Sequence, residues 1–395
     1  MDKKTEWKEK KISFGNAIIM STVFAVVGVL FGALGQSLSR GEFGVVQATA
    51  VSADWDSLEE VYTKLTSSYN GEVDAAKALD GAKAGLVESL GDIYTEYFNA
   101  EASSDFYDDL HGNVGSGIGV EMGMRDGYVR VLRTLPDNPA REAGMLAGDI
   151  IYKVGDEEVW MMTTDEVASR VRGEEGTEVA VTVVRNGEEK TFTMKRETIN
   201  NVSEYVEYDG NTAIITITRF DDNTGLKVQE EAAEFAKKGV KKVILDLRSN
   251  GGGYVAAAQD LLSLWLDGKK MYVQKSKHYG NITTSTASGK AILKDIETIV
   301  LVNGTTASAS EIVAGALQDY GMATVVGEKT YGKGVVQNLL ELFGGATLKV
   351  TVADWYTPNE RSINNEGITP DVEVERSYED INAMRDPQMK KAKEL

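Results

Sequence analysis

The sequence contains no cysteine and only two histidines, His111 and His278, among its 395 residues. The absence of cysteine excludes disulfides, thiolate nucleophiles and cysteine-based zinc sites. The shortage of histidine indicates that, if the protein is an enzyme, its general base is another residue type. Proline is also scarce, with 5 residues, whereas glycine is abundant, with 40. This composition predicts many tight turns rather than disorder.

Basic residues are too few to balance the acidic ones. Lys and Arg number 42 against 61 Asp and Glu, which leaves a net charge of -19. A surface this acidic repels phosphate backbones, so nucleic acid is not an expected partner. With 42% apolar residues, the chain is large enough for two or three globular domains.

The amino-terminal segment, residues 1–40, is predicted to anchor the chain in a membrane. No residue from Ile12 to Ser39 carries a charge, and a helix over this run would span roughly the 30 Å of a bilayer core. Five lysines precede the run, which places the amino end in the cytoplasm and the remainder outside. The alternative is a signal peptide cleaved near Ala48-Thr-Ala50, which would give a secreted protein.

The remainder of the chain changes its pattern three times. Residues 41–112 form a linker followed by apolar residues at helical spacing, and residues 113–198 hold short β-rich runs around a helix predicted near 164–171. In residues 199–376 strands alternate with helices, as in an α/β sheet. Residues 377–395 are read as a polar tail.

Three glycines, Gly251, Gly252 and Gly253, follow the apolar strand Val243-Ile-Leu-Asp-Leu247. Backbone N–H groups in such a turn can bind an anion. The turn is not a phosphate loop, because neither the Gly-Lys-Ser/Thr ending nor the Gly-x-Gly-x-x-Gly pattern is present. Two interpretations remain: an oxyanion hole, or a turn that only permits close packing.

Ser308 stands where a predicted strand leads into a predicted helix, three residues before Glu311. The Ser-x-x-Glu pattern is a capping box, so Ser308 can be read as a helix cap and nothing more. It can also be read as a nucleophile, with the N–H of Ala309 in an oxyanion hole. Ser310 is a competing nucleophile that periodicity does not exclude.

Lys333 lies between two glycines, just before a β-like run that contains Gln337. Positions 333, 335 and 337 share one face of a strand, so the Gln337 amide could orient the amine. A lysine base must be neutral, which requires its pKa to fall from about 10.4 towards roughly 7–8 by desolvation. The alternative is an exposed lysine in a glycine turn, although Ser-Lys pairs are known variants of the catalytic triad.

Together these segments resemble the carboxyl-terminal processing protease family, serine peptidases with a Ser/Lys dyad and an embedded PDZ domain. The resemblance covers nearly all of residues 55–375. It rests on the following motifs: Gly91-Asp-Ile-Tyr-Thr-Glu-Tyr97, Asp246-Leu-Arg-Ser-Asn-Gly-Gly-Gly253, Ala307-Ser-Ala-Ser-Glu311, Gly332-Lys-Gly-Val-Val-Gln337, Tyr356-Thr-Pro-Asn-Glu-Arg-Ser-Ile363 and Gly367-Ile-Thr-Pro-Asp371.

The resemblance implies an α/β peptidase core of the ClpP/crotonase-like spiral type, an inserted PDZ domain and no metal or cofactor. It implies that Ser308, not Ser310, is the nucleophile, that Lys333 is the general base and that Gln337 positions the lysine. The implied oxyanion hole consists of the backbone N–H groups of Ala309, Gly251 and Gly252. Gly251 and Ile93 replace family prolines, and Asn359-Glu360 replaces a Ser-Gly pair.

The resemblance also implies a peptide-binding loop in the PDZ domain, made of Gly115, Ser116, Gly117, Ile118 and Gly119. An extended peptide would add a strand beside residues 118–122 with its free carboxyl terminus in this loop. The resulting hypothesis is a membrane-anchored, extracytoplasmic serine endopeptidase that binds protein carboxyl termini, with a possible homodimer through the amino-terminal helices. The alternatives are an inactive PDZ scaffold on the same fold and an acyl-binding or ligand-carrying relative.

Overall fold

The computed structural model describes residues 54–395, except 114, 126, 200, 277–281 and 384. The chain divides into the units Met1–Trp55 and Asp56–Leu395, and the second unit contains the elements considered below. The predicted membrane anchor and the predicted cleavage site lie outside the described residues. Among the described helices, none combines the length and the apolar character needed to cross a bilayer.

The helical region predicted before residue 112 is present. It consists of α2 (Asp56–Ser68), α3 (Ala75–Glu88) and α4 (Ala100–His111), with the short strand β1 (Glu96–Phe98) before α4. Asp74 caps α3 by accepting hydrogen bonds from the N–H groups of its first turn. Neither α2 nor α3 has a fully buried residue, and every residue of α2 is exposed, so the apolar side chains of α2 are not covered by the described part of the chain.

The predicted α/β sheet has six strands in the order β10-β11-β12-β15-β16-β19. All neighbouring pairs are parallel except β10 with β11. The inner strands β11, β12, β15 and β16 are nearly continuous apolar runs, as expected where both faces of a parallel sheet are covered. Their bounds are β10 (Glu204–Asp209), β11 (Thr212–Ile217), β12 (Lys242–Asp246), β15 (Glu297–Val302), β16 (Thr324–Gly327) and β19 (Val372–Glu373).

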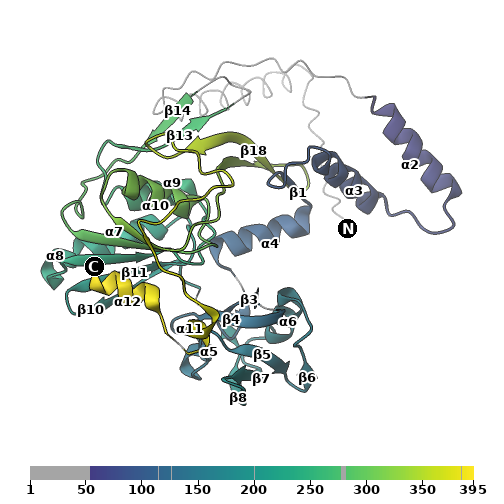
Figure 1. Ribbon diagram of the computed structural model, residues 1–395. Helices are drawn as coiled ribbons and strands as arrows, with labels where there is room; N and C mark the ends of the chain where they lie inside the picture. Colours follow the sequence, from purple (N-terminus) through teal and green to yellow (C-terminus); the bar gives the residue numbers. More distant parts are fainter. Residues whose placement is uncertain (1–53, 114, 126, 200, 277–281, 384) are drawn as a thin grey trace, which may run out of the picture. The chain divides into compact units, whose positions relative to one another are not determined.

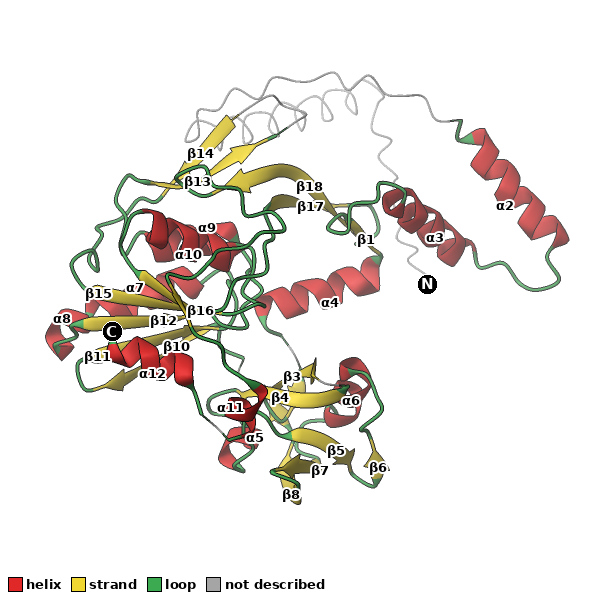
Figure 2. Ribbon diagram, viewed as in Figure 1, coloured by secondary structure: helices red, strands yellow, loops and turns green. Residues whose placement is uncertain are grey.

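Helices cover both faces of this sheet (Figure 2). The larger core lies against α7 (Thr224–Ala233), α9 (Val255–Leu262) and α10 (Ala309–Asp319), and the short α8 (Phe235–Lys238) follows α7. On the opposite face, Ala392 and Met389 of α12 (Pro387–Glu394) pack on strand residues such as Ile244.

A second, antiparallel sheet has five strands: four lie in the order β1-β18-β13-β14, and the fifth, β17, also pairs with β18. Their bounds are β13 (Lys270–Lys275), β14 (Ile282–Thr286), β17 (Val335–Glu341) and β18 (Thr347–Tyr356). Of these strands, the sequence predicts the β-like run that contains Gln337, which is β17. β1 and β17 both pair with residues 347–349 of β18, so β18 connects the helical region before residue 112 to the strand that follows Lys333.

The inserted β-rich domain has its own apolar core. Its main sheet has the order β3-β4-β5-β7-β8, and β6 (Glu157–Glu158) pairs with β5. The helix α6 (Thr164–Val171) has the predicted bounds and begins with a capping box. The strand bounds are β3 (Val120–Arg125), β4 (Tyr128–Thr134), β5 (Ile150–Val154), β7 (Glu178–Arg185) and β8 (Glu188–Lys195), and α5 (Pro139–Glu142) follows β4. The strands β2 (Ser116–Gly117) and β9 (Glu197–Thr198) pair where the chain enters and leaves the domain.

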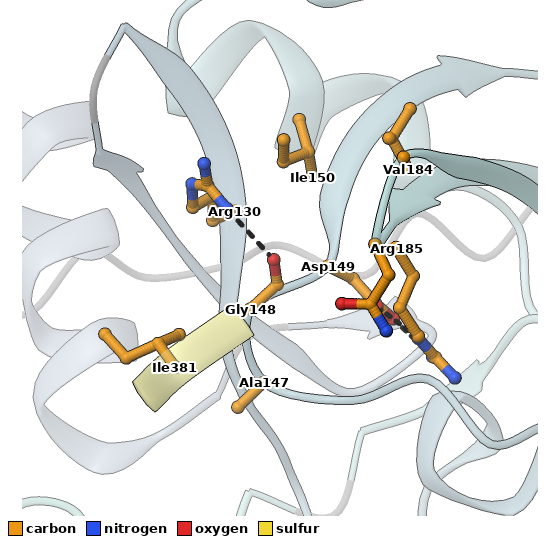
Figure 3. A pocket seen from close by; sticks show the side chains of 10 residues that line it. Arg130, Ala147, Gly148, Asp149, Ile150, Val184, Arg185 and Ile381 are labelled. Carbon is orange, nitrogen blue, oxygen red and sulfur yellow. Dashed lines mark hydrogen bonds and ion pairs between the residues drawn. The ribbon is translucent and has the colours of Figure 1, made fainter. Parts of the chain in front are cut away.

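The polar carboxyl-terminal residues, predicted as a tail, contain two helices. They form α11 (Tyr378–Asn382) and α12, and Ala392 and Gln388 are buried. Ile381 of α11 lies against Gly148 of the inserted domain, beside a cavity of about 280 Å³ (Figure 3). This cavity includes the Asp149–Arg185 ion pair but no predicted site residue. Ile381, Met389 and Ala392 are therefore sufficient to pack this otherwise polar segment against the parallel sheet and the inserted domain.

Candidate active site

Ser308 lies in a sharp turn between β15 and α10. Its φ and ψ angles are 57° and -118°, which is a left-handed conformation for a residue other than glycine. Such a conformation costs about 1–3 kcal/mol and persists only where surrounding contacts hold it. One contact is the hydrogen bond from the Ala307 N–H to the Asn250 carbonyl, which fastens this turn to the turn that follows β12.

The two candidate serines have different environments. Ser310 is fully buried, and its Oγ donates a hydrogen bond to the Asn250 carbonyl at 3.1 Å. Ser308 is only half-buried, and its hydroxyl donates no hydrogen bond to any residue that the structure describes. The cap of α10 uses the Ser308 N–H, which donates to Glu311 at 2.9 Å, so capping leaves the hydroxyl proton available.

The glycine turn lies directly against Ser308. A Cβ on Gly252 would be 2.8 Å from the Ser308 Cβ and 3.0 Å from the Ala309 nitrogen. Of the predicted oxyanion donors, the N–H groups of Ala309 and Gly251 have no acceptor within the described residues. The Gly252 N–H already donates to the Asn250 side chain at 2.8 Å. The arrangement therefore leaves Ala309 and Gly251 as the available donors of the predicted three.

Lys333 is partly enclosed by aromatic side chains. The Lys333 Nζ lies 5.5 Å from the centroid of the Tyr94 ring. The Trp355 indole N–H donates a hydrogen bond to the backbone carbonyl of Lys333. Within the described residues, Nζ has no hydrogen-bond or ion-pair partner. Burial lowers the pKa of Lys333, the Lys349 ammonium lowers it further, and the carboxylates of Glu96 and Glu311 oppose this shift. The net direction is the one that a neutral lysine base requires.

Gln337 does not form the predicted hydrogen bond with the Lys333 amine. Lys333 lies just before β17, and the pairing of β17 with β18 is irregular beside Gln337, where Val352 of β18 is an extra residue between the partners of Val336 and Gln337. The Gln337 amide donates instead to the Tyr94 carbonyl. Gln337 thus holds the backbone of the residue whose ring covers Lys333. Tyr94 itself was present in the family motif but received no role from the sequence.

Glu311 is a second residue whose place in the site could not be read from the sequence. It is fully buried and accepts four hydrogen bonds. The donors are the Ser308 and Lys333 N–H groups to Oε2, at 2.9 and 3.0 Å, and the Gly332 N–H and Thr330 hydroxyl to Oε1, at 2.7 and 2.6 Å. Because the Ser308 and Lys333 nitrogens share one oxygen, they are less than about 6 Å apart. The capping-box pattern was the visible signal, but it predicts only the first of these bonds.

The predicted peptide-binding loop borders a groove of about 480 Å³ between β3 and α6. Gly117, Ile118 and Gly119 line it, whereas Gly115 is exposed at its start. Gly119 cannot carry a side chain, because its Cβ would lie 2.2 Å from the Cβ of Asn138. Ile118, Leu135 and Val171 give the groove an apolar lining, which suits an apolar side chain at the end of a peptide.

Comparison with known proteins identifies relatives of all three regions. Residues 211–374 match peptidase family S41, residues 116–195 match a PDZ domain, and residues 36–102 match the activating protease CtpB N-terminal domain. A probable CtpA-like serine protease of Staphylococcus aureus (strain N315) is 34% identical over 96% of this chain and 75% of its own length. Its counterpart in Staphylococcus epidermidis is 35% identical over 85% of this chain and 68% of its own. Among solved structures, a photosystem II D1 C-terminal processing protease is 26% identical with a TM-score of 0.56, over 84% of this chain and 90% of that one.

Proposed function

Because the chain belongs to the family of CtpA-like S41 serine proteases, we propose that it is a C-terminal processing endopeptidase with a Ser308/Lys333 dyad. It is a serine-type peptidase, and its PDZ domain implies protein or peptide substrates. The observation that carries the proposal is the half-buried Lys333 amine, which has a lowered pKa and, among the described residues, no hydrogen-bond or ion-pair partner, on a segment held beside Ser308 by Glu311.

In this proposal Ser308 Oγ attacks the scissile carbonyl carbon while its proton passes to Lys333 Nζ. The negative charge on the carbonyl oxygen is stabilised by the N–H groups of Ala309 and Gly251. The C–N bond then breaks, and the Lys333 ammonium returns its proton to the leaving amine. Lys333, neutral again, takes a proton from the water that hydrolyses the acyl-enzyme, and Ser308 is restored.

Substrate selection is assigned to the PDZ groove. The free carboxyl terminus of the substrate binds in the loop from Gly115 to Gly119, and the adjoining residues pair with β3 as an added strand. The tethered chain is thereby supplied to Ser308 at a high effective concentration.

The amino-terminal segment is proposed to anchor the protein, with the peptidase on the extracytoplasmic side. The charge-free run from Ile12 to Ser39 and the lysines before it support this orientation. Cleavage near Ala50 would instead release the same catalytic part.

The amino-terminal helices are proposed to form a homodimer. Leu58, Val61 and Leu65 of α2 recur at helical spacing and are 45%, 55% and 47% exposed. A second copy of this amphipathic helix would cover such a stripe.

We expect light scattering of the full chain in detergent to give twice the monomer mass. The double variant Leu58→Glu/Leu65→Glu should give the monomer mass. Lys64→Glu, at an exposed polar position of α2, should remain dimeric. A monomeric wild-type protein would contradict this part of the proposal.

The identity of the nucleophile is tested by a matched pair of substitutions. Ser308→Ala should abolish cleavage of an unfolded protein substrate while leaving the PDZ domain able to bind an apolar carboxyl-terminal peptide. Ser310→Ala should retain cleavage within about threefold, because its hydroxyl makes a structural hydrogen bond worth about 1 kcal/mol. Initial rates by gel densitometry and peptide binding by fluorescence anisotropy measure both effects. The reverse pattern would assign the nucleophile to Ser310.

A further inference from the structure

Glu311 accepts more hydrogen bonds than a helix cap requires. Four donors converge on its carboxylate, and among the described residues it has no cationic partner within ion-pair distance. Three of the donors are backbone N–H groups, which cannot accept a proton in return. The fourth, the Thr330 hydroxyl, already accepts a hydrogen bond from the Ile368 N–H at 2.6 Å. These contacts are satisfied by an ionised carboxylate, held in the interior by donors alone.

Two of these bonds act on the residues that carry the proposed chemistry. The Oε2 atom accepts from the Ser308 N–H, which fixes a backbone whose φ of 57° needs support. The same atom accepts from the Lys333 N–H, and Oε1 accepts from the N–H of Gly332, whose φ is 90°. One carboxylate therefore connects the backbone of the proposed nucleophile to that of the proposed base.

The charge of Glu311 has a separate effect. When Lys333 takes the Ser308 proton it becomes an ammonium in a partly buried, aromatic surrounding. A buried negative charge nearby stabilises this cation more than the neutral amine. Consistently, the Glu311 carboxylate opposes the effect of burial on the pKa of Lys333.

We propose that Glu311 is an ionised positioning residue that aligns Ser308 with Lys333 and stabilises the ammonium formed when Lys333 takes the serine proton. This inference rests on the proposed dyad. It extends the role of Glu311 from capping α10 to organising both reacting residues. The side chain makes no contact with the substrate in this account.

Two substitutions separate alignment from charge. Glu311→Gln removes the charge and places an amide N–H₂ against donors, so kcat should fall about 100-fold, the size expected for a misplacement near 1 Å. The acid limb of the pH profile of kcat/KM should also move to lower pH, because the carboxylate no longer raises the pKa of Lys333. Glu311→Asp keeps the charge but is too short to reach all four donors. It should lose at least about tenfold in kcat while its acid limb stays near that of the wild type.

The control is Asp380→Asn, which removes the acidic residue of another capping box, at α11, without touching the site. It should leave kcat and the pH profile unchanged, and thermal unfolding monitored by circular dichroism verifies the fold of every variant. If Glu311→Gln does not fold, the test rests on Glu311→Asp. A Glu311→Asp variant with wild-type kcat overturns the proposal. Folded Glu311→Gln with wild-type kcat and an unmoved acid limb overturns it as well. Lys333→Met is measured in parallel: an active Lys333→Met refutes the dyad itself, whereas an inactive one with active Glu311 variants refutes only the role of Glu311.

Discussion

Replacing Lys333 with methionine is expected to lower kcat by about four orders of magnitude or more, the loss typical of removing one member of a catalytic unit. Methionine has a similar length and is apolar, so it fills the space beside Tyr94 without an amine. The described residues offer Nζ no hydrogen-bond or ion-pair partner, and burial lowers its pKa. Removing the amine should therefore remove the base without breaking a structural interaction.

Stability and activity are expected to separate in this variant. The melting temperature of Lys333→Met should equal or exceed that of the wild type, because an amine that is costly to bury has been replaced by an apolar group. The matched control is Lys329→Met, an exposed lysine in the same segment, which should keep cleavage within about twofold as a surface substitution. Cleavage by a folded Lys333→Met at a rate near that of the wild type would show that Lys333 is not the base.

Gly252→Ala is expected to produce the second large loss, about 100-fold to 1,000-fold in kcat, which is the size seen when an oxyanion donor is displaced. The new Cβ would lie 2.8 Å from the Ser308 Cβ and 3.0 Å from the Ala307 oxygen and Ala309 nitrogen. Gly252 also has a φ of 105°, which other residues rarely adopt. Relief of the clash must move either the glycine turn or the turn that carries Ser308.

Backbone strain alone can be separated from this displacement. Gly268 also has a positive φ, 63°, but a Cβ there meets no atom within 4 Å. Gly268→Ala should cost about 1 kcal/mol of stability, with kcat unchanged. Steady-state kinetics and urea unfolding of the two alanine variants provide the comparison. Equal kcat values for them would indicate that Gly252 does not constrain the site.

The sequence is sufficient to predict the parallel sheet and α6. The strands that contain Ile215, Leu245 and Val300 are apolar on both faces, and Thr163 with Glu166 forms a recognisable cap before α6. The antiparallel sheet is largely missed, because its pairings join residues far apart in the chain, such as Tyr97 with Leu348. The helices of residues 377–395 are missed because few of their residues are apolar.

In the candidate active site, too, some residues are predicted from the sequence and others are found only in the structure. Motifs identify Ser308, Lys333 and the glycine turn, and the fold brings Gly252 against Ser308 and Glu311 against both backbones. The hydrogen bond from the Gln337 amide to the Tyr94 carbonyl joins residues 243 apart in the sequence, and strand periodicity does not predict such a contact. Glu311 has three donors from residues 330–333, which only the tertiary structure brings to a residue at the start of α10.

The central claim is that the neutral amine of Lys333 is the general base, and it is tested most directly by the pH dependence of kcat/KM in wild type and Lys349→Gln. The Lys349 ammonium lowers the pKa of Lys333. Lys349 also forms an ion pair with Glu96, whose carboxylate raises the pKa of Lys333. Removing the ammonium leaves that carboxylate unpaired, and both changes favour protonated Lys333. The account predicts wild-type activity that rises with pH through a Lys333 pKa below the usual 10.5, and a rise displaced to higher pH in Lys349→Gln. A flat wild-type profile from about pH 6 to 9, or two rises that coincide, would contradict it.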